Sequence, residues 1–241
     1  MATKPPLDGP GLGPLATPAA HLSALRDASQ SLQLGLDDTA LQRLLDYLAL
    51  LQRWNQVYNL TALRDAGLML SHHLLDCLAV LPALRRHVAG LAVGAPNQAV
   101  KLLDVGIGGG LPGAVLAIAQ PDWQVDCVDA VAKKAGFVRQ VALDLRLPNL
   151  QGLHARVETL AAAPRRYDLI VSRAFASLAD FARLSAGALS EAGVWAAMKG
   201  KPPEDEQANL PPGVTLFHVE PLTVPGLDAR RCLVWMRRQA T

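Results

Sequence analysis

Apolar residues recur every three or four positions in the first half of the chain, a spacing that indicates amphipathic helices. One such series occupies Leu41, Leu44, Leu45, Leu48 and Leu51, and Trp54 extends it. The side chains of Asp37-Asp38-Thr39 precede the series and can cap a helix, so we predict that a helix begins there. A second helix is predicted over 67–81, with Pro82 ending it. Together the two helices predict a helical cap before the main domain.

From residue 99 onward, short apolar runs alternate with segments of helical periodicity. The run 99–103 predicts a strand, which a glycine-rich turn joins to a helix that starts at 114–119. Further strands are predicted at 124–129, 150–154, 167–172 and 194–198, and helices at 132–147 and 178–189. No convincing helix separates 214–219 from 232–236, so we expect an antiparallel pair. The alternation predicts an α/β fold whose mostly parallel sheet is covered by helices on both faces.

Composition divides the chain into three parts. Residues 1–30 are rich in proline, glycine and alanine and predict a flexible tail. Residues 31–98 contain the helical cap and end in a linker, and residues 99–241 form the α/β domain. The 241 residues are 51% hydrophobic and 18% charged, which is typical of a globular protein with ample core.

Charge and cysteine content exclude several classes. A net charge of +2 does not by itself indicate a nucleic-acid partner. Three widely spaced cysteines form neither a disulfide framework nor a zinc motif, and the adjacent pair His72-His73 lacks metal-ligand spacing. We expect no bound metal, no membrane span and no secretory signal, and therefore a cytoplasmic protein.

The segment Asp104–Gly113 carries most of the chemical information. It reads Asp-Val-Gly-Ile-Gly-Gly-Gly-Leu-Pro-Gly and links a predicted strand to a predicted helix. Glycine permits positive φ angles and close approach of a ligand to the backbone, so we expect Gly106 and Gly108 to contact a cofactor. The dinucleotide-binding fingerprint would require glycine at Leu111, so that fingerprint is absent. The alternative is a tight turn with no ligand.

Polar residues follow several of the predicted strands, where open α/β sheets bind ligands. Asp129 follows the glycine segment at a spacing that suits hydrogen bonds to ribose hydroxyls, although it could instead cap the next helix. Val157 could support an adenine ring, with Glu158 or a nearby backbone group at its amino group. Arg173 and Lys199 end adjacent apolar strands, which suits a phosphate-bearing substrate, although structural ion pairs would explain them as well.

Two further features favour an anionic partner. The segment 54–65 mixes aromatic, amide and basic side chains that can meet bases and phosphates, although a plain packed loop explains it nearly as well. Pairs of basic residues recur at Arg85-Arg86, Lys133-Lys134, Arg165-Arg166, Arg230-Arg231 and Arg237-Arg238. Each pair alone is typical of a solvated surface, but their number favours an anionic partner.

These residues resemble a known family over most of the chain, from about Leu41 to Met236. The shared motifs are Trp54-Asn55-x-x-Tyr58-Asn59-Leu60-Thr61, His73-Leu74-Leu75-Asp76, Asp104-Val105-Gly106, Gly110-Leu111-Pro112-Gly113, Arg156-Val157-Glu158, Ser172-Arg173-Ala174-Phe175-Ala176-Ser177, Met198-Lys199-Gly200 and Pro203-Glu204-Asp205-Glu206. The chain is similar to the bacterial 16S ribosomal RNA guanine-N7 methyltransferases, also named glucose-inhibited division protein B. It departs from the family pattern at Ile107, Gly109, His72 and Ala130.

The resemblance implies a class I S-adenosylmethionine-dependent methyltransferase fold, Rossmann-like, with a seven-stranded sheet. It implies cofactor contacts from Gly106, Leu111, Val157, Glu158 and Arg173, with Asp129 at the ribose. For RNA we expect contacts from a second set, namely Asn59, Arg64, His73 and Lys199.

The implied reaction moves a methyl group from S-adenosylmethionine to N7 of a guanine in 16S ribosomal RNA. Because N7 carries a free lone pair, we assign no catalytic acid or base. Arg173 and Lys199 would position the substrate, and a fixed carboxylate near the ring could balance its new charge. Partners would be 16S RNA or the small ribosomal subunit, and the protein would be a monomer. The alternatives are methylation of a small molecule or protein, and a non-catalytic nucleotide-binding regulator.

Overall fold

The computed structural model describes residues 17–91, 99–173, 175 and 177–239. The N-terminal helices are α1 (Pro18–Ser31), α2 (Asp38–Tyr58), α3 (Ala66–Met69), α4 (Asp76–Leu78) and α5 (Leu81–Leu91). A π-helical segment, η1 (Leu70–Leu75), joins α3 to α4 without a break. Asp37 begins α2 as predicted, because its side chain accepts a 2.7 Å hydrogen bond from the backbone N–H of Ala40.

The rest of the described chain alternates strands and helices, as predicted. The strands are β1 (Lys101–Val105), β2 (Gln124–Asp129), β3 (Leu150–His154), β4 (Tyr167–Ser172), β5 (Leu189–Lys199), β6 (Val214–Leu222) and β7 (Arg231–Arg238). The helices between them are α6 (Gly113–Ala119), α7 (Ala132–Asp144) and α8 (Leu178–Ser185), with a 3-10 helix, η3 (Val157–Ala162), after β3. The helix predicted over 178–189 is shorter, since a 3-10 turn and the start of β5 take its last residues.

All seven strands form one sheet in the order β3-β2-β1-β4-β5-β7-β6. The strands β1 to β5 pair in parallel, whereas β7 runs antiparallel to both β5 and β6. The predicted mostly parallel sheet with an antiparallel final pair is therefore confirmed. Because β7 is reversed, its first residues lie beside the last residues of β5, and Lys199 pairs with Cys232.

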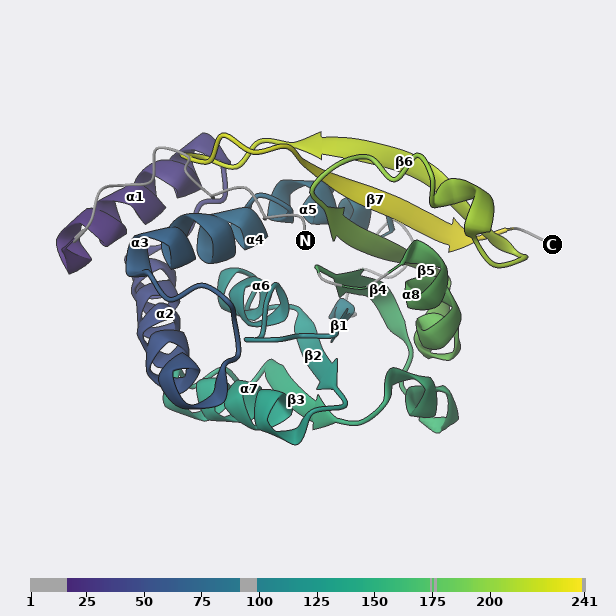
Figure 1. The fold of residues 1–241 in the computed structure, drawn as a ribbon, viewed down its shortest axis with the longest axis horizontal. Helices are drawn as coiled ribbons and strands as arrows, with labels where there is room; N and C mark the ends of the chain where they lie inside the picture. Colours follow the sequence, from purple (N-terminus) through teal and green to yellow (C-terminus); the bar gives the residue numbers. More distant parts are fainter. Residues whose placement is uncertain (1–16, 92–98, 174, 176, 240–241) are drawn as a thin grey trace, which may run out of the picture.

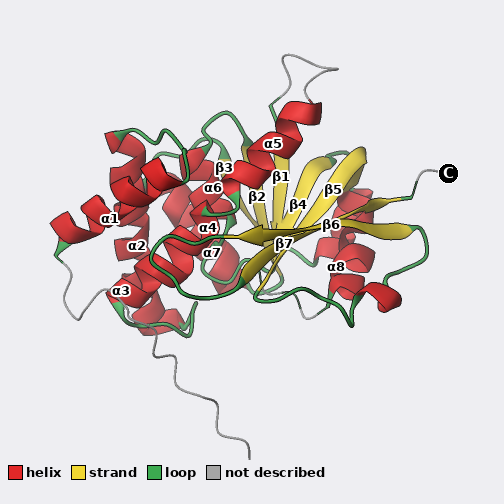
Figure 2. Ribbon diagram, turned by 90° about the horizontal axis from the view of Figure 1, so that it is seen from above, coloured by secondary structure: helices red, strands yellow, loops and turns green. Residues whose placement is uncertain are grey.

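Alternate residues of each strand feed two hydrophobic clusters, one on each face of the sheet. In β1, Leu102 packs into the larger cluster with α2, α6 and α7, whereas Leu103 packs into the smaller one with α8. Figures 1 and 2 show α6 and α7 on one face, with α2 outside them, and α8 on the opposite face. The prediction of helices on both faces is confirmed.

The N-terminal helices share the larger cluster with the sheet. Leu25 of α1, Leu44 of α2 and Leu74 of η1 are buried in the same cluster as Leu102 and Val125. The hydrophobic core is therefore continuous across the boundary that we predicted between residues 98 and 99.

Three sequence predictions differ from the structure in this region. Residues 18–31 form α1, so the predicted tail over 1–30 does not extend through them, and residues 1–16 lie outside the described part. Thr17 caps this helix and Pro18 is its first residue, a position where a missing N–H costs nothing. Pro82 likewise does not end a helix but sits in the first turn of α5. The predicted linker is occupied by α5 up to Leu91, and 92–98 are not described.

The stretch Ala66–Gly90 is long and apolar enough to cross a membrane by length and composition alone, with a mean hydropathy of 1.4. Within the fold, 78% of its most apolar 18-residue stretch is buried. This burial is typical of a core helix, and it accounts for the apolar character of the segment.

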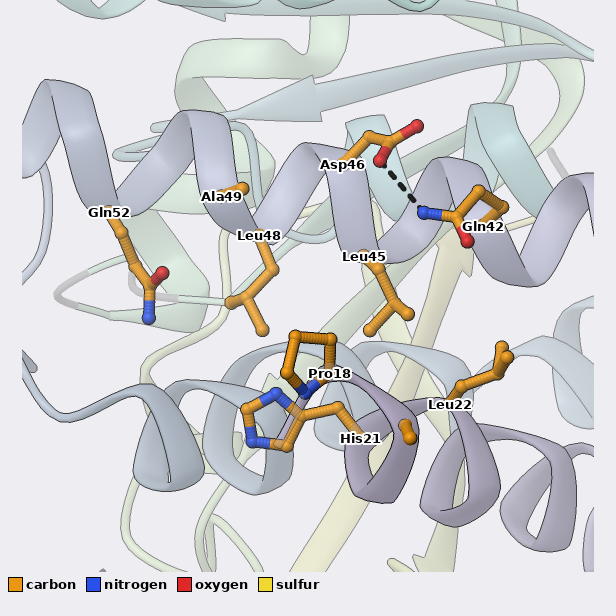
Figure 3. A pocket seen from close by; sticks show the side chains of 10 residues that line it. Pro18, His21, Leu22, Gln42, Leu45, Asp46, Leu48, Ala49 and Gln52 are labelled. Atoms are coloured by element: carbon orange, nitrogen blue, oxygen red, sulfur yellow. Dashed lines mark hydrogen bonds between the residues drawn. The ribbon is translucent and has the colours of Figure 1, made fainter. Parts of the chain in front are cut away.

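A groove lies between α1 and α2 (Figure 3), with a volume of about 450 Å³. Pro18 and His21 of α1 face Leu45 and Leu48 of α2 across it. None of its lining residues belongs to the pockets at the carboxyl ends of the strands.

Packing at the start of α6 predicts that a single methyl group added at Gly113 lowers the stability of the fold. A Cβ atom at Gly113 would lie 2.4 Å from Sγ of Cys127 and 2.9 Å from Oδ2 of Asp104. We expect Gly113→Ala to lower the free energy of unfolding by about 1–3 kcal/mol through overpacking. Gly136→Ala is the matched control, because Gly136 is helical with nothing within 4 Å of the added Cβ. The control should raise stability by about 0.5–1 kcal/mol. Urea denaturation measures both, and equal effects would contradict the packing argument.

Candidate functional site

Two pockets lie at the carboxyl ends of the parallel strands. The first, called here the glycine-loop pocket, has a volume of about 480 Å³. Among the residues that line it are Gly106, Gly108, Asp129, Val157 and Glu158. The second, called here the arginine pocket, has a volume of about 360 Å³. It is lined by, among others, His72, His73, Asp76, Arg173, Lys199 and Arg231.

The glycine loop after β1 adopts the backbone conformation that the sequence predicted. Gly106, Gly108 and Gly110 have φ angles of +75°, +52° and +81°, which side chains with a Cβ rarely adopt. At Gly106 the nearest atom to an added Cβ would be 3.9 Å away, on Phe175. The backbone at this point is therefore accessible to a ligand in the glycine-loop pocket.

The loop is fixed by bonds to two neighbouring elements. The hydroxyl of Tyr47, from α2, donates a 2.6 Å hydrogen bond to the carbonyl of Gly109. The N–H of Gly113 donates to Oδ2 of Asp104 at 2.8 Å, which ties the start of α6 to the end of β1. Asp104 is fully buried, and its Oδ1 has no hydrogen-bond partner among the described residues. Burial raises the pKa of this carboxyl from 3.8 to about 7.

Asp129 ends β2 in the wall of the glycine-loop pocket. Its Oδ1 accepts a 2.9 Å hydrogen bond from the N–H of Val131, and its Oδ2 lies 3.2 Å from Nζ of Lys134. The first contact orders the entry to α7, which was the alternative role considered for Asp129. The carboxylate also lines the pocket, so both positions expected from the sequence occur together.

Five predicted cofactor residues therefore line one pocket, but Leu111 and Arg173 do not line it. Leu111 is 2% exposed and packs in the larger hydrophobic cluster, because the turn into α6 directs its apolar side chain inward. The side chain of Leu111 therefore packs in the core, and its contact with the cofactor stays a prediction. Arg173 lines the arginine pocket instead.

Arg173 is oriented by acceptors on the N-terminal helices. Its Nη1 donates a 3.0 Å hydrogen bond to the carbonyl of His72 and lies 3.8 Å from Oδ2 of Asp76. Arg231, at the start of β7, donates from Nε to Oδ1 of Asp76 at 2.7 Å. Asp76 thus pairs with guanidinium groups from β7 and from the segment after β4, two strands that flank β5. The ion pair considered for Arg173 is present.

His73 is a buried, neutral residue. It is 4% exposed, its Nε2 lies 2.7 Å from the hydroxyl of Thr61, and its Nδ1 lies 3.0 Å from the carbonyl of His72. Burial and the nearby Arg173 guanidinium lower the pKa of His73 to about 4. We assign the proton to Nδ1, so that the Thr61 hydroxyl donates to Nε2. Both ring nitrogens are engaged within the protein, and the RNA contact of His73 stays a prediction.

Lys199 also has a partner that the sequence pattern did not indicate. Its Nζ lies 2.8 Å from Oε1 of Glu206, whose Oε2 accepts a 2.7 Å hydrogen bond from the N–H of Leu178. The structural ion pair considered as the alternative role of this cation is therefore present. Lys199 still lines the arginine pocket, at the end of β5.

Asn59 and Arg64 are exposed on the segment between α2 and α3. Asn59 ends α2 with a φ of +50°, and its Oδ1 accepts a 3.3 Å hydrogen bond from Arg64. An added Cβ at Gly108 would lie 3.5 Å from the carbonyl of Leu60, so this segment borders the glycine loop. Its polar side chains are therefore available beside the glycine-loop pocket.

The sequence did not predict three residues that line or border the two pockets, namely Asp76, Arg231 and Lys134. A signal existed for Asp76, since a carboxylate in an apolar helical series must have a partner. Arg231 was counted only as one of several surface pairs. Within the described part of the chain, no group of three or more metal-ligating side chains occurs.

The sheet order, the glycine loop after β1 and the pocket beside it define a class I methyltransferase fold, as the resemblance implied. A family profile described as GidB, rRNA small subunit methyltransferase G, matches residues 40–234. The chain belongs to this family of methyltransferases.

Individual relatives extend the match to most of the chain. Ribosomal RNA small subunit methyltransferase G of Albidiferax ferrireducens is 58% identical over 220 residues, covering 90% of this chain and 97% of that protein. The protein of the same name from Acidovorax ebreus is 58% identical over 215 residues, covering 89% and 94%. The crystal structure of TrmN from Thermus thermophilus covers 70% of this chain and 53% of its own, with 22% identity and a TM-score of 0.48.

The buried Asp104 predicts a pH dependence of stability. Its pKa is about 7 in the folded protein and near 3.8 in the unfolded chain, so the folded state binds this proton more tightly. The resulting stabilisation is complete below pH 4 and is lost as the pH rises from about 4 to about 7. Asp104→Asn removes this group but keeps an oxygen acceptor for Gly113.

We therefore expect the difference in free energy of unfolding, wild type minus Asp104→Asn, to decrease as the pH rises through that window. Urea denaturation at several pH values measures it. His73 titrates in both proteins, so it cancels from the difference. A difference that is constant with pH would show that Asp104 does not titrate there.

Proposed function

We propose that this protein transfers a methyl group from S-adenosylmethionine to N7 of a guanine in 16S ribosomal RNA. The observation that carries the proposal is the arrangement of the two pockets. The segment after β4 contributes Arg173 to the arginine pocket and Phe175 to the glycine-loop pocket. A cofactor in one pocket and a base in the other would therefore share a boundary. Family membership supports the reaction and its ribosomal RNA substrate.

The glycine-loop pocket fits the cofactor. Its volume of about 480 Å³ lies within the range of small-molecule sites. The positive φ angles at Gly106 and Gly108 leave bare backbone beside the space. Asp129 would accept hydrogen bonds from ribose hydroxyls with the lone pairs that Val131 and Lys134 leave free. Val157 and the exposed Glu158 would meet the adenine at the start of η3.

Bound S-adenosylmethionine supplies an activated methyl group. The residues of this chain then need only orient the acceptor, because N7 of guanine carries a free lone pair and loses no proton. Positioning of the two reactants can account for a large part of the rate. Arg173 is suited to this task because the His72 carbonyl and Asp76 restrain its guanidinium in the arginine pocket.

RNA would contact the rim through exposed polar groups. Asn59 and Arg64 border the glycine loop, and Tyr58 beside them is 40% exposed. Such groups can stack on unpaired bases and meet phosphates. Lys199 would reach a phosphate only by exchanging its bond to Glu206. Binding to RNA would weaken with salt, as expected when phosphate contacts contribute. We propose that the protein acts as a monomer in the cytoplasm, on 16S RNA or the small subunit.

The cofactor site predicts a loss of binding at one glycine. Gly106→Val forces a β-branched residue to φ +75° and places two methyl groups at the pocket wall. We expect the dissociation constant for S-adenosylmethionine, measured by calorimetry, to rise at least about tenfold, which corresponds to about 1.4 kcal/mol.

Gly213→Val is the matched control. Gly213 has a φ of +78° with nothing within 4 Å of an added Cβ, and it precedes β6 at the opposite edge of the sheet. The control should suffer similar backbone strain and bind the cofactor normally. Equal affinity in both variants would mean that the glycine loop is a turn without a ligand.

The reaction itself is tested by methyl transfer. Purified protein and S-adenosylmethionine with a tritiated methyl group are incubated with 16S RNA, and separately with small subunits, from a strain that lacks the family enzyme. We expect label at one guanine, and borohydride reduction followed by aniline cleavage identifies that guanine as N7-methylated. Label on a protein or small molecule, with none on RNA, would favour a different methyltransferase. No transfer despite cofactor binding would favour a regulator.

A further inference from the structure

Asp76 is the carboxylate that faces the arginine pocket. Among the described residues that line this pocket, it is the one acidic side chain. Asp104 is sealed beneath the glycine loop, Asp129 lines the other pocket, and Glu206 is engaged by Lys199 and Leu178. A carboxylate that reads a base in the arginine pocket would therefore be Asp76.

The two oxygens of Asp76 differ in how they are engaged. Oδ1 accepts the 2.7 Å hydrogen bond from Arg231. Oδ2 lies 3.8 Å from Arg173, which is too long for a hydrogen bond, and it accepts none from the described residues. Each carboxylate oxygen offers two lone pairs. Asp76 is thus oriented by one arginine and keeps acceptor capacity on the side of the other.

The helix that carries Asp76 is distorted at this point. The π-helical segment η1 ends at Leu75, immediately before Asp76, and its His72 carbonyl accepts from Arg173. Single π-helical turns within α-helices are frequent at functional sites. The distortion and the partly free carboxylate oxygen are independent observations, and both belong to the arginine pocket.

Selection of guanine requires a contact at an atom other than N7, either at O6 or on the Watson–Crick edge. Adenine carries the same N7 lone pair, so contact at N7 cannot distinguish the two purines. Guanine presents N1–H and N2–H donors on its Watson–Crick edge, whereas adenine presents an N1 acceptor there. A carboxylate accepts hydrogen bonds from the N1–H and N2–H of guanine, whereas the N1 lone pair of adenine repels it.

We propose that Asp76 determines the specificity for guanine by accepting hydrogen bonds from N1–H and N2–H of the target base, while Arg173 donates to O6. This inference rests on the proposed function. O6 lies between the Watson–Crick edge and N7. Arg173 lies 3.8 Å from Asp76 and is followed two residues later by Phe175, which lines the glycine-loop pocket. Methylation at N7 makes the purine cationic and strengthens its N–H donors. The carboxylate therefore stabilises the transition state more than the bound substrate.

Modified RNA tests the proposal. Once the methylated guanine has been mapped, splint-ligated RNA carries inosine or adenine at that position. Inosine keeps N1–H, O6 and N7 but lacks the N2 amino group. We expect wild-type kcat/KM to fall about tenfold with inosine, as for one lost hydrogen bond to a charged group, and transfer to adenine to be undetectable.

Variants assign this discrimination to Asp76. An amide can accept from N6–H and donate to N1 of adenine, so Asp76→Asn should lose activity on guanine and gain it on adenine, and the inosine penalty should shrink. Asp76→Glu keeps the charge, so it should be slower but retain the inosine penalty. This second variant preserves the test if Asp76→Asn does not fold.

The matched control is Asp126→Asn. Asp126 is 3% exposed and pairs with Arg165 and the hydroxyl of Tyr167, but it lines neither pocket. It should lose stability and keep the base preference. Equal wild-type rates on guanine and inosine, or an unchanged guanine preference in Asp76→Asn, would overturn the role of Asp76 but leave the proposed function intact. Absence of transfer from wild type to unmodified RNA would overturn the proposed function and this inference with it.

Discussion

The fold of the active edge depends on one hydrogen bond between a buried carboxylate and a backbone N–H. Asp104 is the next-to-last residue of β1, and its Oδ2 accepts a hydrogen bond from the N–H of Gly113 at the start of α6. Because this short bond spans the whole glycine loop, the loop must turn back sharply and adopt positive φ angles at three glycines. Burial raises the pKa of the carboxyl, so the constraint carries an electrostatic cost. The exposed backbone that a cofactor needs is a consequence of this closure.

The arginine pocket depends on a different feature, the reversal of β7. A parallel strand would place Arg231 at the opposite edge of the sheet, far from the end of β4. Because β7 is antiparallel to β5, its first residue lies beside Lys199 and reaches Asp76 on the N-terminal helices. Arg173 reaches the same carboxylate from the segment after β4. Three distant parts of the chain therefore meet at one carboxylate.

Local patterns in the sequence predicted the elements and the glycine-loop pocket, because strand ends and glycine turns are local properties. The side-chain partners could not be predicted in the same way. Lys199 and Arg173 were correctly placed at strand ends, but their partners were not predicted. Glu206 lies seven residues after Lys199 in a segment without a clear pattern, and Asp76 meets Arg173 only through the tertiary fold. Leu111 follows the predicted loop, yet its side chain turns inward because the α2–α7 layer offers an apolar site. The prediction that Pro82 ends a helix was wrong for a simpler reason, since proline is also common in the first turn of a helix.

The π-helical segment Leu70–Leu75 has a consequence for how this chain can change in length. A π-helical turn holds one residue more than an α-helical turn, and each added residue rotates the remainder of the helix by about 100°. Deleting one residue here would restore regular hydrogen bonding but would turn Asp76 away from Arg231, or turn Leu78 out of the core. The number of residues in this buried helix is therefore under as strong a constraint as their chemistry.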